Sequence, residues 1–160
     1  MPRRIDPRYC NTHIDAHVLD RKGSLEDAVV DEILSLYEES RIKLLLPYSV
    51  KNEIEHPNTP PDVKRRAARL VYTIPVQLTQ NEIDLHRKVC RILQGNAKPG
   101  KHDSDAYHLV ESDKYGAGYF ITNDSRIHKK RPEIAKLLQV VIVTPANFLS
   151  LYRSFEGGAA

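Results

Sequence analysis

Tyr119-Phe-Ile-Thr-Asn-Asp124 is the stretch that decides the fold, because a short apolar run passes directly into polar residues that end in an acid. Val140-Val-Ile-Val143 is a second short apolar run, and the segment from Pro145 onward has the pattern of a closing helix. Short apolar strands that alternate with amphipathic helices are typical of an α/β domain with a mainly parallel sheet. The sequence therefore predicts a single three-layer domain, in which helices flank a central sheet.

The same alternation continues outward from this stretch along the rest of the chain. We expect strands over residues 9–16, 41–46, 73–76, 119–122 and 140–143. We expect helices over residues 24–37, 49–55, 62–72, 79–95, 103–116 and 132–138, and from 145 onward. Ser24-Leu-Glu-Asp27 and Thr79-Gln-Asn-Glu82 both have the spacing of a capping box, which marks the start of a helix, and Gly95 is expected to end the second of these helices.

Length and composition favour one domain in the cytoplasm. The 160 residues divide into an N-terminal extension at 1–8, a domain at 9–152 and a disordered tail at 153–160. No apolar run is long enough to cross a bilayer, and the first residues lack the apolar segment of a secretory signal. Cys10 and Cys90 are far apart and are expected to be core side chains rather than a disulfide. These features together predict a cytoplasmic protein that does not associate with membranes.

Basic residues are concentrated in two stretches, although the net charge of the chain is only +3. One stretch spans residues 64–69 and the other spans residues 126–131. Side chains that gather in this way favour contact with the backbone phosphates of a polyanion. We expect RNA contacts from Lys64, Arg65, Arg66, Arg126, Lys129 and Lys130. The alternative is that both stretches only solvate the faces of helices.

Four acidic residues occupy positions at which parallel α/β sheets bind ligands. Asp15 ends the first predicted strand, and Asp124 follows the strand at 119–122. Glu53 lies about one helical turn after the second strand, and Asp105 falls in the first turn of its helix. Carboxylates that converge need a cation to offset their repulsion, and their oxygens suit Mg²⁺ or Mn²⁺. Two of the acids also have a structural explanation, because Asp105 would stabilise the helix dipole and Asp124 would cap the next segment.

Four motifs in series resemble those of the PIN domain. They are Ile14-Asp-Ala-His-Val-Leu19, Leu46-Pro-Tyr-Ser-Val-Lys-Asn-Glu-Ile54, Asp103-Ser-Asp-Ala-Tyr-His-Leu109 and Tyr119-Phe-Ile-Thr-Asn-Asp124. Their order and intervals match the family, as do the closing strand and helix, and the resemblance covers roughly residues 9–152. It implies a central parallel sheet between helices, and a Mg²⁺- or Mn²⁺-dependent ribonuclease that acts on single-stranded RNA.

The resemblance also implies roles for individual residues. It assigns catalysis to Asp15, Glu53, Asp105 and Asp124. It assigns metal binding to Asp15, Asp105 and Asp124, and a supporting role to Thr122, Asn123 and, at the periphery, Asp103. Metal-assisted attack of water on phosphorus would leave products with 5′-phosphate and 3′-hydroxyl ends.

The chain departs from the family next to Asp15. The family often has a hydroxyl residue and a small polar residue at the next two positions, where this chain has Ala16 and His17. A catalytically silent PIN-like domain that binds RNA or a protein is therefore the alternative. If the domain is active, it is either the toxin of a toxin–antitoxin pair, with an antitoxin protein as its partner, or a stand-alone RNA-processing enzyme. A homodimer is a further expectation, because dimers are common in families of this kind.

Overall fold

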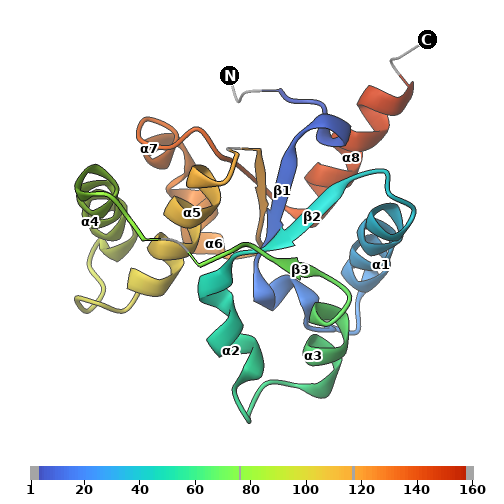
Figure 1. Cartoon of the computed structure of the whole chain (residues 1–160), viewed down its shortest axis with the longest axis horizontal. Coiled ribbons are helices and arrows are strands. Elements are labelled where there is room, and N and C mark those ends of the chain that lie inside the picture. Colours follow the sequence, from blue (N-terminus) through green and yellow to red (C-terminus); the bar gives the residue numbers. More distant parts are fainter. Residues whose placement is uncertain (1–3, 76, 117, 158–160) are drawn as a thin grey trace.

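Five parallel strands form the centre of the protein in a computed structural model, which describes residues 4–75, 77–116 and 118–157 (Figure 1). The strands are β1 (Asn11–Ile14), β2 (Lys43–Leu46), β3 (Val71–Tyr72), β4 (Tyr119–Ile121) and β5 (Val141–Val143). Their order across the sheet is β3-β2-β1-β4-β5, and every neighbouring pair is parallel. The predicted α/β class and the parallel sheet are confirmed.

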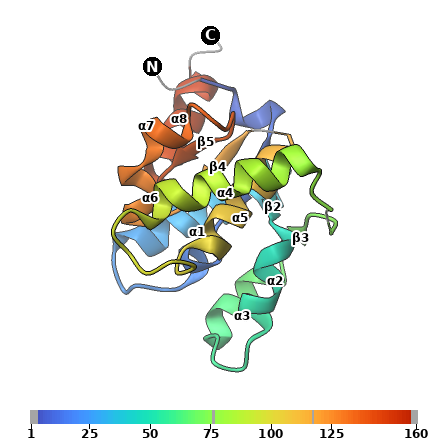
Figure 2. The same ribbon diagram turned by 90° about the vertical axis from the view of Figure 1, so that its left-hand side faces the viewer.

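Helices cover both faces of the sheet. The two on one face are α1 (Leu25–Glu38) and α8 (Pro145–Gly157). Those on the other face are α4 (Gln80–Gln94), α5 (Asp103–Lys114), α6 (Ser125–Lys129) and α7 (Arg131–Ile134). The remaining two, α2 (Lys51–Glu55) and α3 (Pro61–Ala67), extend beyond the sheet as an arm that both views show (Figures 1 and 2).

The core is divided by the sheet into two apolar clusters. Successive side chains of a strand point to opposite faces, so Tyr119 and Ile121 of β4 lie in the cluster with α1 and α8, while Phe120 lies in the cluster with α4 and α5. All three side chains are at most 1 % exposed. Burial on both faces explains why this strand reads as a continuous apolar run rather than as an alternating one.

The starts and ends of the helices follow local chemistry. At α4 the capping box is complete, because Glu82 N donates to Thr79 Oγ1 over 3.3 Å and Thr79 N donates to Glu82 Oε1 over 2.8 Å. Gly95 ends this helix with a φ of +49°, a conformation that costs glycine little. At α1 the box is only half formed, because Asp27 accepts hydrogen bonds from the preceding loop instead of from the backbone of Ser24.

Four elements differ from the prediction. The helix expected over residues 62–72 ends at Ala67, and the edge strand is Val71–Tyr72 instead of 73–76. Pairing of Tyr72 with Leu46 of β2 overrides the helical pattern of the segment. Residue 76, the last of the predicted strand, lies outside the described residues. The short helix α6 was not predicted, and the helix expected at 132–138 is the shorter α7.

The two ends of the described chain pack against the domain and against each other. Residues 153–157, expected to be part of a disordered tail, continue α8, because Arg153 forms a bidentate ion pair with Glu32 of α1. Residues 4–8 of the predicted extension are also held, since Arg8 donates to the carbonyl oxygen of Phe155 over 3.5 Å. Within the ranges that the structure describes, no helix combines the length and the apolar character needed to cross a bilayer.

Candidate active site

The strand order reverses between β1 and β4. From β1 the chain proceeds outward to β2 and β3 on one side of the sheet, and β4 and β5 lie on the other side. In open α/β sheets, ligands bind outside the carboxyl ends of the strands at this kind of reversal. Asp15 and Thr122 are the first residues after the two strands, and Asp15 N donates to the carbonyl oxygen of Ile121 over 2.9 Å. The fold therefore places two residues of the predicted site at the expected binding crevice.

Thr122 joins the two aspartates that follow these strands. Its Oγ1 donates to Asp15 Oδ2 over 2.9 Å and accepts a hydrogen bond from Asp124 N over 3.1 Å. Asp15 Oδ1 accepts from His17 N over 3.4 Å, and Asp15 as a whole is only 6 % exposed. The hydroxyl of Thr122 thus fixes the side chain of one acid and the backbone of the other.

Asp105 brings a third carboxylate to the same place from the first turn of α5. Burial raises the pKa of Asp105, and the negative charges of Asp124 and Asp15 raise it further. His102 opposes this effect weakly, because its Nδ1 lies 3.5 Å from Asp105 Oδ2. The three aspartates therefore face one another closely enough for their charges to interact.

Glu53 lies at the edge of this group and reaches it through His108. Glu53 Oε1 is 3.1 Å from His108 Nε2, and this hydrogen bond lowers the pKa of Glu53 although partial burial acts in the opposite direction. His108 also interacts electrostatically with Asp15 and Asp105. All four acids predicted from the sequence thus gather around the carboxyl ends of β1 and β4, with His108 between Glu53 and the aspartates.

Three polar residues behind the acids were not in the predicted set. His108 Nδ1 is 2.6 Å from Ser49 Oγ, and Ser49 donates from both its hydroxyl and its backbone N to Glu111, each over 3.1 Å. A signal was present in the sequence, because Asp105, His108 and Glu111 recur every third residue and therefore lie along one side of a helix.

The donor chemistry suits a hard divalent cation, but the ligands are not preassembled. Among the described residues, no group of three or more His, Cys, Asp or Glu side chains has an arrangement that could hold a metal ion. Asp124 Oδ1 is occupied in capping α6, where it accepts from Arg126 N over 2.8 Å and Ile127 N over 3.3 Å. The capping role considered for Asp124 is therefore confirmed, and metal binding would require the three carboxylates to move closer together.

The supporting residues fall into two groups. Asn123 is next to the acids, and its Nδ2 is buried without a hydrogen-bond partner, as is His102 Nε2. Asp103 instead interacts with α4, where burial and the Asp103 carboxylate raise the pKa of the Cys90 thiol to about 11. The structure thus gives Asp103 a contact with α4 rather than with the three aspartates.

Two of the arginines predicted to bind RNA have structural roles. Arg66 is 5 % exposed, because it extends inward from α3 to the carbonyl oxygen of Leu19 and the carboxylate of Asp31. Arg126 is half-buried, and its Nη1 donates to two carbonyl oxygens at the end of α4 over 3.0 and 3.3 Å. The donors of both arginines thus have partners within the fold, and contact of these two residues with RNA stays a prediction.

The other basic residues of the prediction are on the surface. Lys64, Arg65 and Lys129 are exposed, whereas Lys130 is half-buried and lies 3.7 Å from Glu133. Arg65 forms an ion pair with Asp62 one helical turn away. These residues are accessible to a polyanion, but they belong to separate helices and do not form one continuous set.

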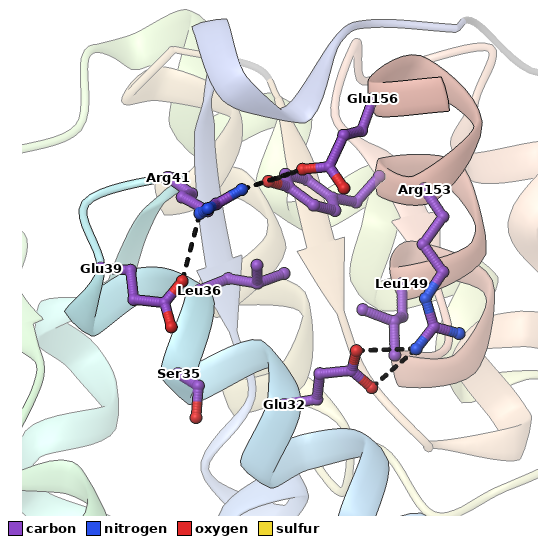
Figure 3. A pocket seen from close by; sticks show the side chains of 9 residues that line it. Glu32, Ser35, Leu36, Glu39, Arg41, Leu149, Arg153 and Glu156 are labelled. Carbon is purple, nitrogen blue, oxygen red and sulfur yellow. Dashed lines mark hydrogen bonds and ion pairs between the residues drawn. The ribbon is translucent and has the colours of Figure 1, made fainter. Parts of the chain in front are cut away.

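A surface pocket of about 240 Å³ lies in a different part of the molecule, between α1 and α8 (Figure 3). Its floor includes Leu36 and Leu149, and its rim carries charged side chains that pair with one another, such as Arg153 with Glu32. None of the residues predicted for the site lines it. Because its charges are already paired, we place the candidate site at the carboxyl ends of the strands.

Similarity to characterised proteins would be independent evidence on the identity of this site. No protein-family model matches the chain, and no curated protein or solved structure matches it with statistical significance, so the resemblance to the PIN domain stays a prediction.

Proposed function

We propose that the chain is a divalent-cation-dependent ribonuclease with a PIN-like domain, and that it hydrolyses phosphodiester bonds of single-stranded RNA. The observation that carries the proposal is the meeting of Asp15, Asp105 and Asp124, from three different elements, at the reversal point of the strand order. A purely structural role explains each acid singly. It does not explain why Asp105 is buried where the charges of Asp15 and Asp124 raise its pKa beyond the effect of burial.

The three aspartates are the residues that would hold the cation. Their oxygens are the ligands that Mg²⁺ and Mn²⁺ prefer, and a cation would remove the repulsion that raises the pKa of Asp105. When bound, such an ion lowers the pKa of water and stabilises the charge that develops on a phosphoryl group.

The chain itself contributes positioning and a proton acceptor. Thr122 holds the Asp15 side chain and the Asp124 backbone, so the acids that follow β1 and β4 are kept in register. Glu53 is kept ionised by its hydrogen bond to His108, and in the proposed reaction its carboxylate accepts a proton from the attacking water. Attack of the water oxygen on phosphorus breaks the bond to the 3′-oxygen, which takes up a proton from solvent, so the products carry 5′-phosphate and 3′-hydroxyl ends.

The substrate would be held by residues outside the acidic group. Lys64, Arg65 and Lys129 are exposed, and contacts of such side chains with phosphate supply affinity without sequence specificity. Binding is therefore expected to weaken steeply as the salt concentration rises.

The proposal is tested with a labelled single-stranded RNA, incubated with the protein in Mn²⁺ and in EDTA. Asp15→Asn and Asp124→Asn are the informative variants, because asparagine retains the acceptor oxygen that caps the following helical turn and so preserves the fold. Glu32→Gln, on the α1–α8 surface, is the matched control for loss of one carboxylate. We expect cleavage by the wild type and the control in Mn²⁺ only, and none by the two aspartate variants.

Cleavage that persists in EDTA, or in both aspartate variants, would contradict the metal–carboxylate mechanism. Binding of RNA without cleavage under any condition would instead support the catalytically silent domain.

A further inference from the structure

A chain of hydrogen bonds connects the exposed edge of the candidate site with the interior of the protein. It begins at Glu53 on α2, passes through His108 on α5 and Ser49 in the 3₁₀ turn Tyr48–Val50, and ends at Glu111 on α5. The heavy-atom distances along it are 3.1, 2.6 and 3.1 Å. Two parts of the chain that are distant in sequence, the consecutive turn and helix over residues 48–55 and the helix α5, therefore meet in one continuous polar network.

Two members of the network, His108 and Glu111, are buried, whereas Ser49 and Glu53 are partly exposed. The side chain of Glu53 is 40 % exposed, whereas His108 and Glu111 are 3 % and 1 % exposed. Polar groups at such depth cost free energy unless all of them are hydrogen-bonded, and here each of them has a partner. Apolar side chains could join α5 to the turn at a lower cost in free energy. The use of polar side chains here therefore calls for a functional explanation.

With both glutamates ionised, the number of donors and acceptors sets the direction of each bond, although burial raises the pKa of Glu111. Glu111 accepts from Ser49, both from the hydroxyl and from the backbone N. With its hydroxyl proton committed to Glu111, Ser49 Oγ accepts from His108 Nδ1–H. His108 Nε2–H then donates to Glu53, so both ring nitrogens carry protons and the imidazole is a cation.

A cationic His108 also fits the charges around it. Burial by itself would lower the pKa of His108, but the hydrogen bond to Glu53 and the charges of Glu53, Asp15 and Asp105 outweigh burial and raise it. The imidazolium is thus surrounded by three of the four acids of the candidate site, which makes it an internal counter-ion to them.

We propose that His108 is a positioning residue, which holds the Glu53 carboxylate at the acidic group and is itself held in one orientation by Ser49 and Glu111. The inference rests on the proposed ribonuclease function. It assigns a task to three residues that lie outside the predicted set: Glu111 orients Ser49, Ser49 orients the ring, and the ring fixes the proton acceptor. In this arrangement α5 supplies both Asp105 and the support for Glu53.

The network is tested first without RNA or metal, by NMR of the His108 ring in ¹⁵N-labelled protein near neutral pH. The wild type is expected to show protons on both ring nitrogens, with the signature of an imidazolium. In Glu53→Gln the Nε2 proton is expected to be lost or to exchange rapidly, because its charged acceptor is gone. Glu53 is partly exposed, so this variant is expected to fold, and Glu55→Gln on the same helix is the matched control.

The consequence for catalysis is tested by the kinetics of RNA cleavage in Mn²⁺. His108→Leu is expected to lower kcat by roughly 10-fold to 100-fold with little change in KM, because the acceptor is displaced while the RNA contacts are intact. His108→Gln, which retains one N–H donor for Glu53, is expected to recover part of that loss. Ser49→Ala is expected to have an intermediate effect, since it frees the ring without removing it.

Distinct outcomes overturn the inference and the function on which it rests. A His108 ring whose signals are the same in wild type and Glu53→Gln would overturn the network, whatever the enzyme does. Equal kcat values for His108→Leu, His108→Gln and the wild type would overturn the positioning role. A wild-type protein that cleaves no RNA would overturn the ribonuclease function and the catalytic role of His108 with it, while the NMR result would still decide whether the network exists.

Discussion

Two networks of charged side chains lie on opposite sides of the molecule. Between α1 and α8, Arg153 pairs with Glu32, and Arg41 pairs with Glu39 and Glu156. The side chains of these pairs are about half exposed, at 47–61 %. At the carboxyl ends of the strands, His108 and Glu111 are almost fully buried and are linked to each other through Ser49, and His108 also bonds to Glu53, whose side chain is 40 % exposed.

The difference shows how burial separates ordinary surface pairing from a candidate site. Exposed ion pairs are screened by water and typically contribute less than about 1 kcal/mol each, so their presence needs no function to explain it. A buried charge is costly, and breaking its network is costlier still. The acids around Asp15 and Asp105 add mutual repulsion to that cost. The two sides of the protein therefore respond differently to the same type of substitution.

The largest expected effect is on activity. Asp105→Asn is expected to lower RNA cleavage by about 100-fold or more, because one of the three carboxylates is lost. The same variant is expected to be more stable than the wild type by about 1 kcal/mol, since it removes a desolvated charge that opposes Asp15 and Asp124. Cleavage assays and urea unfolding measure the two quantities. A variant that loses activity and stability together would indicate a structural role for Asp105.

The next effect is on stability. His108→Leu is expected to lower the free energy of unfolding by about 3 kcal/mol, because it leaves the buried Glu111 and its partner Ser49 with an incomplete network. Arg153→Ala, which breaks an exposed pair on the other side, is expected to cost less than about 1 kcal/mol. If urea unfolding shows the same loss of stability for the two variants, the two networks do not differ in their contribution to stability.

A similar contrast exists within α3. Arg66→Ala is expected to cost about 2 kcal/mol of stability, because it leaves the Leu19 carbonyl oxygen and Asp31 without their donor. The neighbouring Arg65→Ala is expected to cost less than about 0.5 kcal/mol, since Arg65 is on the surface. RNA affinity, measured by filter binding at fixed salt, is expected to fall for Arg65→Ala rather than for Arg66→Ala in the folded protein. A larger loss of RNA affinity for Arg66→Ala than for Arg65→Ala would instead support Arg66 as an RNA contact.

The smallest effect is the pH dependence of the Glu53–His108 pair. The pKa of Glu53 is lowered, so its contribution to stability is present above the ordinary value of 4.5 and is lost as pH falls through the shifted value. The pKa of His108 is raised, so its contribution is complete below 6.5 and is lost as pH rises through the shifted value. The difference in stability between wild type and Glu53→Gln is therefore expected to be largest between pH 4.5 and 6.5.

This difference is expected to stay below about 1 kcal/mol, because Glu53 is 40 % exposed and solvent screens the pair. Thermal unfolding at several pH values, with Glu55→Gln as the control, measures it. A difference that does not vary with pH would mean that the pair is not ionic.

Much of the fold could be predicted because its signals are local. The capping box at Thr79 and the glycine at 95 bound α4 as expected, and the apolar runs of β4 and β5 became strands. The edge strand β3 was displaced by a few residues, because pairing with β2 decides its position. The short helix α6 was missed although Asp124, its N-cap, had been considered for that role.

The candidate site was predicted in part for the same reason. Acids that follow strands can be recognised in a sequence. The inward position of Arg66 was not recognised, because the residue belongs to a basic run. It shares the inward side of α3 with Val63 and Ala67. The partners of His108 come from two other elements, so spacing along α5 alone could not identify them.

The sequence by itself determined the alternation of strands and helices and the acids at the ends of strands, because hydrophobic period, capping and turn chemistry act over a few residues. The tertiary structure alone decided that the strand order reverses between β1 and β4, that Asp15, Asp105 and Asp124 face one another, and that Ser49 and Glu111 stand behind His108. These relations join residues that are up to about a hundred positions apart, and only the packing of the sheet against its helices brings them into contact.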